Sequence, residues 1–258
     1  MFFGRAITPQ QKHETIVCVP KPHKPLRPAD YRPITLLNND YKIVARILAH
    51  RLRPMMKIYL KSTQYCEVPR NTTQDAVARI RDALAHAENT KTPLCILTLD
   101  FKKADRIVHS YLFTILHCYG LSPSLINLII NTYDGATSAV QIKGHSHGPI
   151  PIRCGLRQSC RMSMALYALC LQPLFQMLEL RLPGIQIERF AHPVSFAAYA
   201  DDVTVFATTV ADFSNLGKSY AYTKRPPASA LTLSNPRPSP LDDGLPLTHF
   251  LGFLTTPT

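Results

Sequence analysis

Residues 191–209, with the sequence AHPVSFAAYADDVTVFATT, constrain the fold of this chain more than any other stretch. The segment is almost wholly apolar except for two adjacent carboxylates, Asp201 and Asp202, at its centre. The flanking residues 194–199 and 203–206 are rich in β-branched and aromatic side chains, which favours two strands. A two-residue hairpin turn favours Asn-Gly or Asp-Gly, so Asp-Asp in that place is unusual. A solvated acidic turn is the plain alternative, but a local rule broken without local compensation points to function.

Charge is distributed unevenly along the 258 residues, which are enough for one large domain or two small ones. The net charge is +12, and residues 1–61 hold twelve Lys or Arg against three acidic residues, a net of +9. A basic N-terminal lobe indicates a polyanionic partner, with nucleic acid first and an anionic membrane surface second. A solvated basic face is the alternative that charge alone leaves open.

The cysteines and the hydropathy pattern indicate the cellular compartment in which the protein is found. Seven cysteines, an odd number with no CxxC pair, indicate reduced thiols and neither a disulfide framework nor a zinc site. No charged-then-apolar leader opens the chain, and no run of 18 apolar residues occurs. We therefore expect an intracellular protein, nuclear or cytoplasmic, with no membrane partner.

The basic N-terminal part predicts a strand, a loop and a helix. Residues 15–19 form the strand, and the Pro-punctuated residues 20–38 form an extended loop that displays its cations to phosphates. Residues 38–40 begin an amphipathic helix through residue 60, kinked or restarted at Pro54, whose apolar stripe is expected to be core. The cations of the loop are Lys21, Lys24, Arg27 and Arg32; the apolar stripe is Ile43, Val44, Ile47, Leu48, Leu52, Met55, Met56, Tyr59 and Leu60.

Further along, a carboxylate follows a buried strand. Residues 94–99 (LCILTL) form an unbroken apolar run that ends on Asp100. An unpaired buried charge is costly, and a metal ion would resolve that cost. We also expect helices at 74–87, 110–119, 123–133, 162–180 and 211–223, the first with Val77, Ile80 and Leu84 on one side. Residues 137–142 and 149–153 are expected to form a hairpin whose Gly-rich turn exposes His145 and His147. Irregular chain at 224–246 and a last strand at 248–254 complete the expected elements.

Three carboxylates can then meet. If the strand before Asp100 and the hairpin at Asp201 and Asp202 are neighbours in one sheet, their oxygens can share a pair of Mg²⁺ ions. Two such ions clamp an in-line phosphoryl transfer, and basic residues of the N-terminal lobe would hold a triphosphate.

Five segments in order resemble the reverse transcriptase domain of non-LTR (LINE-type) retrotransposons. They are DYRPITLLNNDYKIVARILAHRL at 30–52, LTLDFKKADRIVHSYLF at 97–113, GLRQSCRMSMALYALCLQPL at 155–174, AYADDVTVF at 198–206 and HFLGFLT at 249–255. The third is similar to the family's RQGCPLSP motif, and the fourth contains its YADD motif. YADD alone is a weak signal, whereas four motifs in order and correctly spaced are a strong one.

The resemblance implies an α+β fold, the fingers and palm of a right-hand polymerase. The palm would be an antiparallel sheet with helices on one face, and the thumb would be absent or truncated. The implied divisions are a fingers-like basic lobe at 1–92 with a part returning around 110–155, a palm at 93–223, and a Pro-rich irregular segment with a terminal strand at 224–258. The implied partners are an RNA template, a DNA primer and deoxynucleoside triphosphates.

The resemblance also implies roles for residues that match the motifs. Asp100, Asp201 and Asp202, with the backbone carbonyl of Phe101, would bind two Mg²⁺ ions, or Mn²⁺. The incoming nucleotide would contact Arg32, Lys21 and Gln158, and Tyr199 would lie near the primer end.

Departures from the family pattern accompany these matches. The aromatic residue that excludes a ribose 2′-OH is missing between Ala104 and Asp105, which predicts feeble deoxynucleotide incorporation and poor rejection of ribonucleotides. Ser159 and Arg161 replace Gly and Pro of RQGCP, Glu67 and Arg70 stand where related sequences often have Gly, and Asn235 replaces a Lys. Because no endonuclease, thumb or C-terminal nucleic-acid-binding region is recognisable, the chain is expected to be a retrotransposon-derived fragment.

Two hypotheses for function remain, with a weaker third. The first is an RNA-directed DNA polymerase domain, and the second is a nucleic-acid-binding remnant of that domain with little or no activity. The third is a metal-dependent nuclease that uses the same carboxylates.

Overall fold

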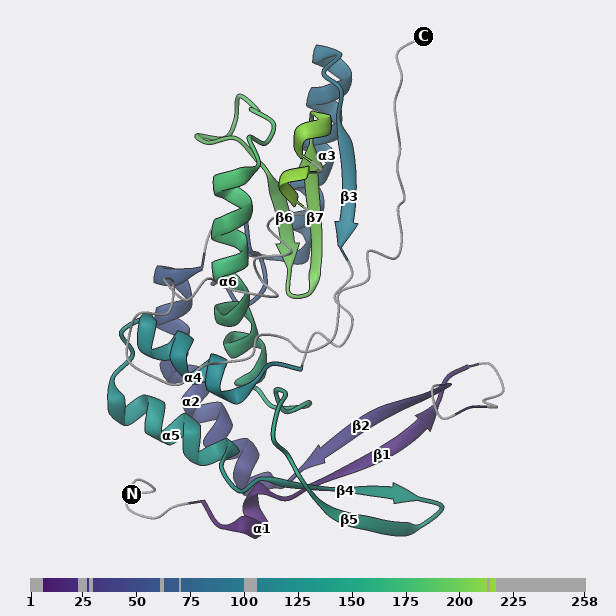
Figure 1. The fold of residues 1–258 in the computed structure, drawn as a ribbon, viewed down its shortest axis with the longest axis vertical. Coiled ribbons are helices and arrows are strands. Elements are labelled where there is room, and N and C mark those ends of the chain that lie inside the picture. The colour runs from purple at the N-terminus through teal and green to yellow at the C-terminus, as the bar shows by residue number, and fades with distance from the viewer. Residues whose placement is uncertain are drawn as a thin grey trace.

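The computed structural model describes residues 7–22, 27, 30–60, 63–69, 71–99, 106–212 and 214–216, which form helices and two separate sheets (Figure 1). The helices are α1 (Pro9–Lys12), α2 (Asn39–Tyr59), α3 (Thr73–Thr90), α4 (His109–Cys118), α5 (Pro123–Tyr133) and α6 (Ser163–Arg181). The strands are β1 (Glu14–Pro20), β2 (Tyr31–Leu37), β3 (Cys95–Leu99), β4 (Thr137–Ile142), β5 (His145–Pro151), β6 (Phe196–Tyr199) and β7 (Asp202–Ala207). The expected irregular segment at 224–246 and strand at 248–254 lie outside the described residues.

The first sheet has the strand order β2-β1-β4-β5 and projects from the body of the molecule (Figure 1). Strand β1 runs antiparallel to β2 and parallel to β4.

The prediction of a loop throughout residues 20–38 was wrong, because residues 31–37 form β2. Pro33 is tolerated there because β2 is an edge strand, in which a missing N–H need not interrupt a ladder. The prediction that His145 and His147 lie in a turn was also wrong: both lie in β5, although both are exposed as expected.

The second sheet has the strand order β3-β7-β6, and all its pairings are antiparallel. Leu99, the last residue of β3, pairs with Val203, and Tyr199 at the end of β6 pairs with Asp202 at the start of β7. The expectation that the strand before Asp100 and the 194–206 hairpin share one sheet is therefore confirmed.

Helix α2 packs on the body with a face that the sequence pattern did not predict. Its buried residues are Tyr41, Ala45, Leu48, Leu52 and Met56, whereas Ile43 is 56% and Ile47 is 38% exposed. Each residue turns an α-helix by about 100°, so a residue two places from Tyr41 and two from Ala45 points to the opposite side. The placement of Ile43 and Ile47 in the core was therefore wrong. The helix also continues through Pro54 without a restart.

Helix α3 buries three of its five alanines. Ala76, Ala83 and Ala87 are buried, while Val77 is 42% and Leu84 is 39% exposed. Small side chains allow the helix to approach β6, which it contacts. Of the larger apolar residues of this helix, Ile80 packs against the same core as these alanines, whereas Val77 and Leu84 do not belong to its buried face.

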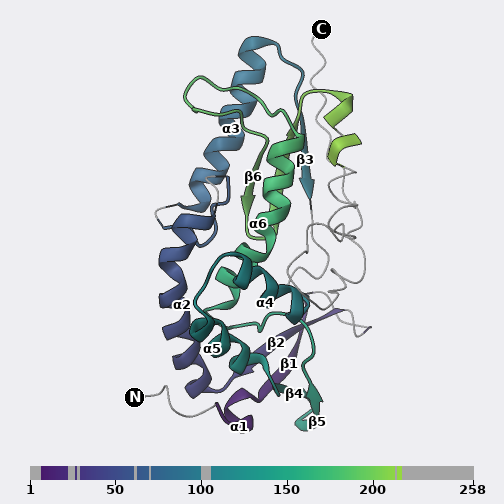
Figure 2. The same ribbon diagram turned by 60° about the vertical axis from the view of Figure 1, so that its left-hand side comes forward.

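Helix α6 lies in the middle of the molecule, between α2, α4 and the second sheet (Figure 2). Every residue from Ala165 to Gln172 is buried, and Phe175 stacks on Phe196 of β6 with ring centroids 5.1 Å apart. This all-round burial explains a helix that is apolar on every side. No helix within the described residues is long and apolar enough to cross a membrane.

Candidate active site

The acidic hairpin turns one residue earlier than its sequence suggests. The Tyr199–Asp202 pairing leaves Ala200 and Asp201 as the two turn residues, so Asp202 begins β7. Ala200 has a φ of 55°, which a type II′ turn requires at its first position. The prediction of an Asp201-Asp202 turn was therefore wrong. The tight turn displays Asp201, which is half-buried, next to Asp202, which is exposed.

Gln64, a residue that the sequence analysis did not single out, holds this turn in place by hydrogen bonding. Its side chain is fully buried, and its Oε1 accepts hydrogen bonds from the backbone N–H of Cys66 at 2.9 Å and of Ala200 at 3.3 Å. Backbone hydrogen bonds between Thr63 and Ala198 and between Tyr65 and Ala198 join the same two segments. A polar residue before an apolar pair gave no signal of this role in the sequence.

The strand that precedes the first proposed ligand in the sequence pairs with the strand that follows this turn. Strand β3 ends at Leu99, one residue before Asp100, and Leu99 pairs with Val203, one residue after Asp202. Asp100 and Phe101, together with the altered positions Ala104 and Asp105, lie outside the described residues. The sheet therefore brings the end of β3 to the residues that follow the acidic turn.

A buried thiol lies beside the turn. Burial raises the pKa of Cys66 to about 11, and the negative charges of Glu67 and Asp201 add to that rise. The thiol therefore stays protonated at neutral pH, so Cys66 is not a nucleophile. Glu67 has a φ of 59°, in the left-handed region that glycine adopts without strain.

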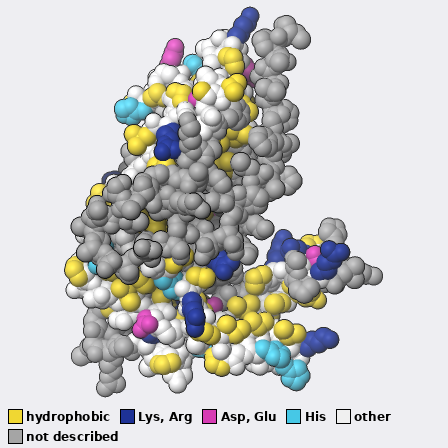
Figure 3. Space-filling view, in the orientation of Figure 1, with side chains coloured by type: hydrophobic (Ala, Val, Ile, Leu, Met, Phe, Trp, Pro, Cys, Tyr) yellow, Lys and Arg dark blue, Asp and Glu magenta, His cyan; other side chains and the backbone are white. Residues whose placement is uncertain are grey.

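Lys21 and Arg32 lie together at the outer end of the β1–β2 hairpin. The N–H of Lys21 donates to the carbonyl of Asp30 at 2.9 Å, and Arg32 pairs with Val19. The side chains of Lys21 and Arg32 are exposed. Figure 3 shows hydrophobic side chains along this sheet and Lys or Arg side chains at its outer end. The exposed large apolar residues of the sheet are Val19, Tyr31, Ile34, Leu36, Ile142 and Ile150.

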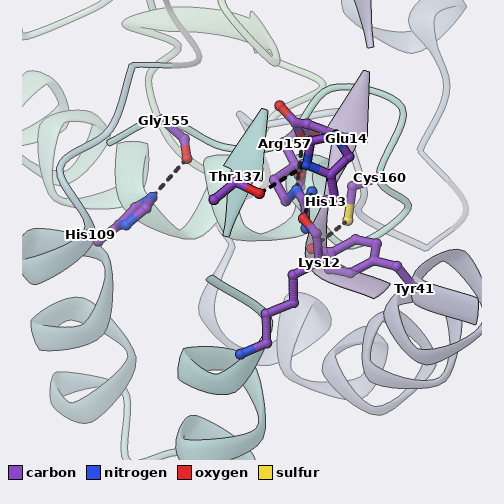
Figure 4. A network of polar contacts seen from close by, with 10 residues as sticks. Lys12, His13, Glu14, Tyr41, His109, Thr137, Gly155, Arg157 and Cys160 are labelled. Atoms are coloured by element: carbon purple, nitrogen blue, oxygen red, sulfur yellow. Dashed lines mark hydrogen bonds and ion pairs between the residues drawn. The ribbon is translucent and has the colours of Figure 1, made fainter. Parts of the chain in front are cut away.

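Gln158 is exposed in the loop at residues 155–160, which precedes α6. His109 Nε2 lies 3.0 Å from the carbonyl oxygen of Gly155, which can only accept, so this ring nitrogen carries a proton (Figure 4). Burial lowers the pKa of His109, and its hydrogen bond to Gly155 opposes that change. Ser159 has a φ of 59°, the left-handed conformation that glycine adopts without strain.

Within the described residues, some of the predicted site residues lie close together and others lie apart. The hairpin groups Tyr199, Asp201 and Asp202, while Lys21 and Arg32 form a second group. No group of three His, Cys, Asp or Glu side chains arranged for a metal ion occurs among residues that the structure describes, a range that omits Asp100. Two adjacent carboxylates at the end of a sheet, half-buried and exposed, fit a hard divalent cation in type.

Comparison with known proteins identifies the class. The family model described as "Reverse transcriptase (RNA-dependent DNA polymerase)" matches residues 19–221. The chain therefore belongs to the reverse transcriptase family. Reverse transcriptases generally use divalent metal ions.

Curated relatives narrow the class to the non-LTR retrotransposon type. The chain is 35% identical, over 71% of its length, to "Transposon TX1 uncharacterized 149 kDa protein" of Xenopus laevis. It is 27% identical, over 75% of its length, to the "Retrovirus-related Pol polyprotein from type-2 retrotransposable element R2DM" of Drosophila melanogaster. The chain spans only 14% and 18% of these two relatives. It is a reverse transcriptase domain of the non-LTR retrotransposon type.

Solved structures show the same fold. The chain is similar to the apo telomerase of Candida tropicalis with a TM-score of 0.56 and 11% identity, covering 86% of this chain and 42% of that one. The telomerase of the same organism in complex with a fragment of telomeric RNA gives a TM-score of 0.55 and 12% identity, covering 83% and 38%. The α+β fold is therefore of the polymerase type found in telomerase reverse transcriptase.

Proposed function

We propose that this domain is an RNA-directed DNA polymerase, which joins a deoxynucleotide to a primer 3′-OH on an RNA template. The observation that carries the proposal is the pairing of Leu99 with Val203, because it sets the end of β3 beside the start of β7, next to Asp202 and the Ala200–Asp201 turn. Membership of the reverse transcriptase family and the RNA in the telomerase complex support it. In this proposal the β3-β7-β6 sheet belongs to a palm at 93–223, and residues 1–92 belong to fingers.

The metal centre of the proposal uses Asp100, Asp201, Asp202 and the carbonyl oxygen of Phe101. Their oxygen atoms would hold two Mg²⁺ ions, with Mn²⁺ as a substitute. When bound, a pair of divalent ions lowers the pKa of an attacking hydroxyl and stabilises the charge of a transferring phosphoryl group. The protein contributes a turn that Gln64 supports by a hydrogen bond to Ala200, with Asp201 in the turn and Asp202 at the start of β7.

Substrate contacts complete the proposal. Lys21 and Arg32 would neutralise the triphosphate of the incoming nucleotide, because cations aimed at transferring phosphates stabilise their developing charge. Gln158 would face the nucleotide and the template. Tyr199, which is 37% exposed one residue before the turn, would lie near the primer end.

Primer extension tests the proposal. The unmodified chain, given an oligo(dT) primer on poly(rA), dTTP and Mg²⁺, is expected to lengthen the primer, and chelation with EDTA should stop the reaction. A parallel incubation of the primer without dTTP tests the nuclease alternative, which predicts shortening. Lack of extension with both Mg²⁺ and Mn²⁺, in protein shown to be folded, would reject the polymerase.

A specific observation favours a second candidate, a nucleic-acid-binding remnant with little activity. Ser159 adopts a left-handed φ of 59° beside Gln158, where the resembled motif has glycine. A non-glycine residue in that conformation is strained by roughly 1–2 kcal/mol, which weakens the folded loop. The remnant would bind a primer–template and yet fail the extension assay.

A further inference from the structure

One buried side chain, that of Arg157, joins the loop at 155–160 to the start of β1 (Figure 4). Its Nε donates to Glu14 Oε2 at 2.8 Å, and the two side chains are 1% and 8% exposed. Its Nη2 donates to the backbone carbonyl of Lys12. The guanidinium carbon lies 4.2 Å from the centroid of the Tyr41 ring of α2. Arg157 therefore contacts α2 and the chain on both sides of the α1–β1 junction.

The arrangement is better suited to fixing geometry than to adding stability. Removing two charges from water costs about as much as their attraction returns, so an apolar replacement of a buried ion pair is often equally stable. A guanidinium, however, is planar and directs its donors along fixed axes, which a lysine cannot reproduce. Here one plane meets a carboxylate, a carbonyl and an aromatic face at once.

Hydrogen bonds fix the backbone of Arg157 and of its loop as well as its side chain. Ser163 Oγ, at the start of α6, donates to the carbonyl oxygen of Arg157 at 2.7 Å. On the other side of the loop, the N–H of Gly155 donates to the carbonyl of Ile107 at 2.7 Å. Gln158 follows Arg157 directly, so its backbone starts from a residue with fixed position and orientation.

One partner of Arg157, Glu14, belongs to the same hairpin as the proposed triphosphate contacts. Glu14 begins β1, and Val19, which pairs with Arg32, lies five residues further along that strand. At about 3.3 Å per residue, these two positions are roughly 17 Å apart on one rigid strand. A rotation of β1 at Glu14 would therefore be magnified at Arg32.

We propose that Arg157 is a positioning residue that sets the spacing between Gln158 and the β1–β2 hairpin, and thereby the width of the deoxynucleoside triphosphate site. The inference rests on the proposed function, since it concerns the nucleotide of that reaction. The inference predicts that loss of the planar guanidinium of Arg157 weakens nucleotide binding and leaves primer–template binding unchanged.

The test compares Arg157→Lys and Glu14→Gln with a matched control, Arg189→Lys. Arg189 also pairs with a carboxylate, that of Asp82 at 2.6 Å, and also lies over an aromatic ring, but its side chain is 59% exposed. For each variant, KM for dTTP, kcat, the Kd for primer–template and the thermal midpoint are measured. Amide hydrogen exchange of residues 155–162 reports on the loop without any need for activity.

Arg157→Lys is expected to raise KM about tenfold, with kcat changed less than about threefold, because binding is lost equally in ground and transition states. Exchange of residues 155–162 should quicken, while Arg189→Lys should match the unmodified protein in every readout. An unchanged KM, or parallel losses of kcat and primer–template affinity that follow the thermal midpoint, would overturn the inference. If Arg157→Lys does not fold, Glu14→Gln, which keeps an acceptor and loses the charge, decides by the same criteria.

Failure of the proposed function gives a different pattern. If the unmodified chain extends no primer, equilibrium dialysis of Mg²⁺-dTTP replaces KM as the nucleotide readout. Binding about tenfold weaker in Arg157→Lys, with faster exchange of residues 155–162, would still support the positioning role. Equal binding in the two proteins would overturn it.

Discussion

The side-chain carbonyl of Gln64 accepts a hydrogen bond from the backbone N–H of Ala200 at 3.3 Å, within the turn that displays Asp201. Gln64 is fully buried, and the same oxygen also accepts the N–H of Cys66 at 2.9 Å. One amide therefore satisfies two backbone donors from segments far apart in the sequence. Ala200 keeps its positive φ, which is unfavourable for a residue other than glycine, because surrounding contacts such as this hydrogen bond hold the backbone in that conformation.

Gln64→Leu should destabilise the domain and reduce primer extension. The substitution leaves two buried N–H groups without their acceptor, at a cost of about 1–3 kcal/mol each. We expect a loss of roughly 2–4 kcal/mol in the free energy of unfolding, measured by urea titration. Gln186→Leu is the control, because that exposed side chain only donates, to the carbonyl oxygens of Ile187 and Phe190. Equal effects of the two substitutions would contradict the role of Gln64.

Ser159→Gly should stabilise the domain. Ser159 has a φ of 59°, and glycine removes the strain of that conformation while adding some entropy to the unfolded chain. The net gain is expected to be about 0.5–1 kcal/mol in the free energy of unfolding, and Glu67→Gly, with the same φ, should behave alike. Ser124→Gly in α5 is the control and should destabilise, because glycine weakens a helix. Destabilisation by Ser159→Gly would show that its left-handed conformation is not strained.

Stability should fall in mild acid because of His109. Burial lowers the pKa of this imidazole below its ordinary value of 6.5, so the unfolded chain binds a proton more readily than the folded one. The contribution of neutral His109 is complete above pH 6.5 and is lost as the pH falls through the folded pKa. Urea titrations at pH 7.5 and 5.5 of the protein and of His109→Gln check this. An equal drop in both proteins would assign the pH dependence to other groups.

Nucleic-acid binding should weaken steeply with salt. Residues 1–61 carry a net charge of +9, and Lys or Arg contacts to phosphates release counterions whose return is favoured at high salt. If five phosphates are contacted, the slope of log K against log salt would be about −4. Fluorescence anisotropy of a labelled primer–template from 50 to 200 mM KCl measures that slope. A flat line would argue against an electrostatic interface.

Strong local patterns allowed correct prediction of much of the second sheet. The apolar run at 94–99 and the hairpin around Asp201 are both rich in apolar residues, so composition marks them as strands. Their burial differs: most residues of β6 and β7 are buried, whereas β3 is mostly half-buried and its Thr98 is exposed. Their sharing of one sheet was proposed so that the three carboxylates could meet, since no local rule brings residue 99 to residue 203. The exact turn was missed because Ala200, and not an aspartate, takes the positive φ.

Other features depend on partners that a local pattern does not reveal. Helix α2 offers apolar residues on more than one side, and its packing against the core buries Tyr41 and Ala45 and leaves Ile43 exposed. Strand β2 forms despite Pro33 because it pairs on one side only. Gln64 and Arg157 are polar residues whose importance lies in contacts that span more than 100 positions.

The most direct test of the account compares the unmodified chain with Asp201→Asn in primer extension on poly(rA)–oligo(dT) with Mg²⁺. Asparagine keeps the size of the side chain and removes the charge that a divalent ion requires. The account predicts extension by the unmodified chain and a rate at least about a thousandfold lower for the variant, with primer–template affinity and thermal midpoint equal to or above those of the parent. Extension by Asp201→Asn at the rate of the unmodified chain would contradict the account.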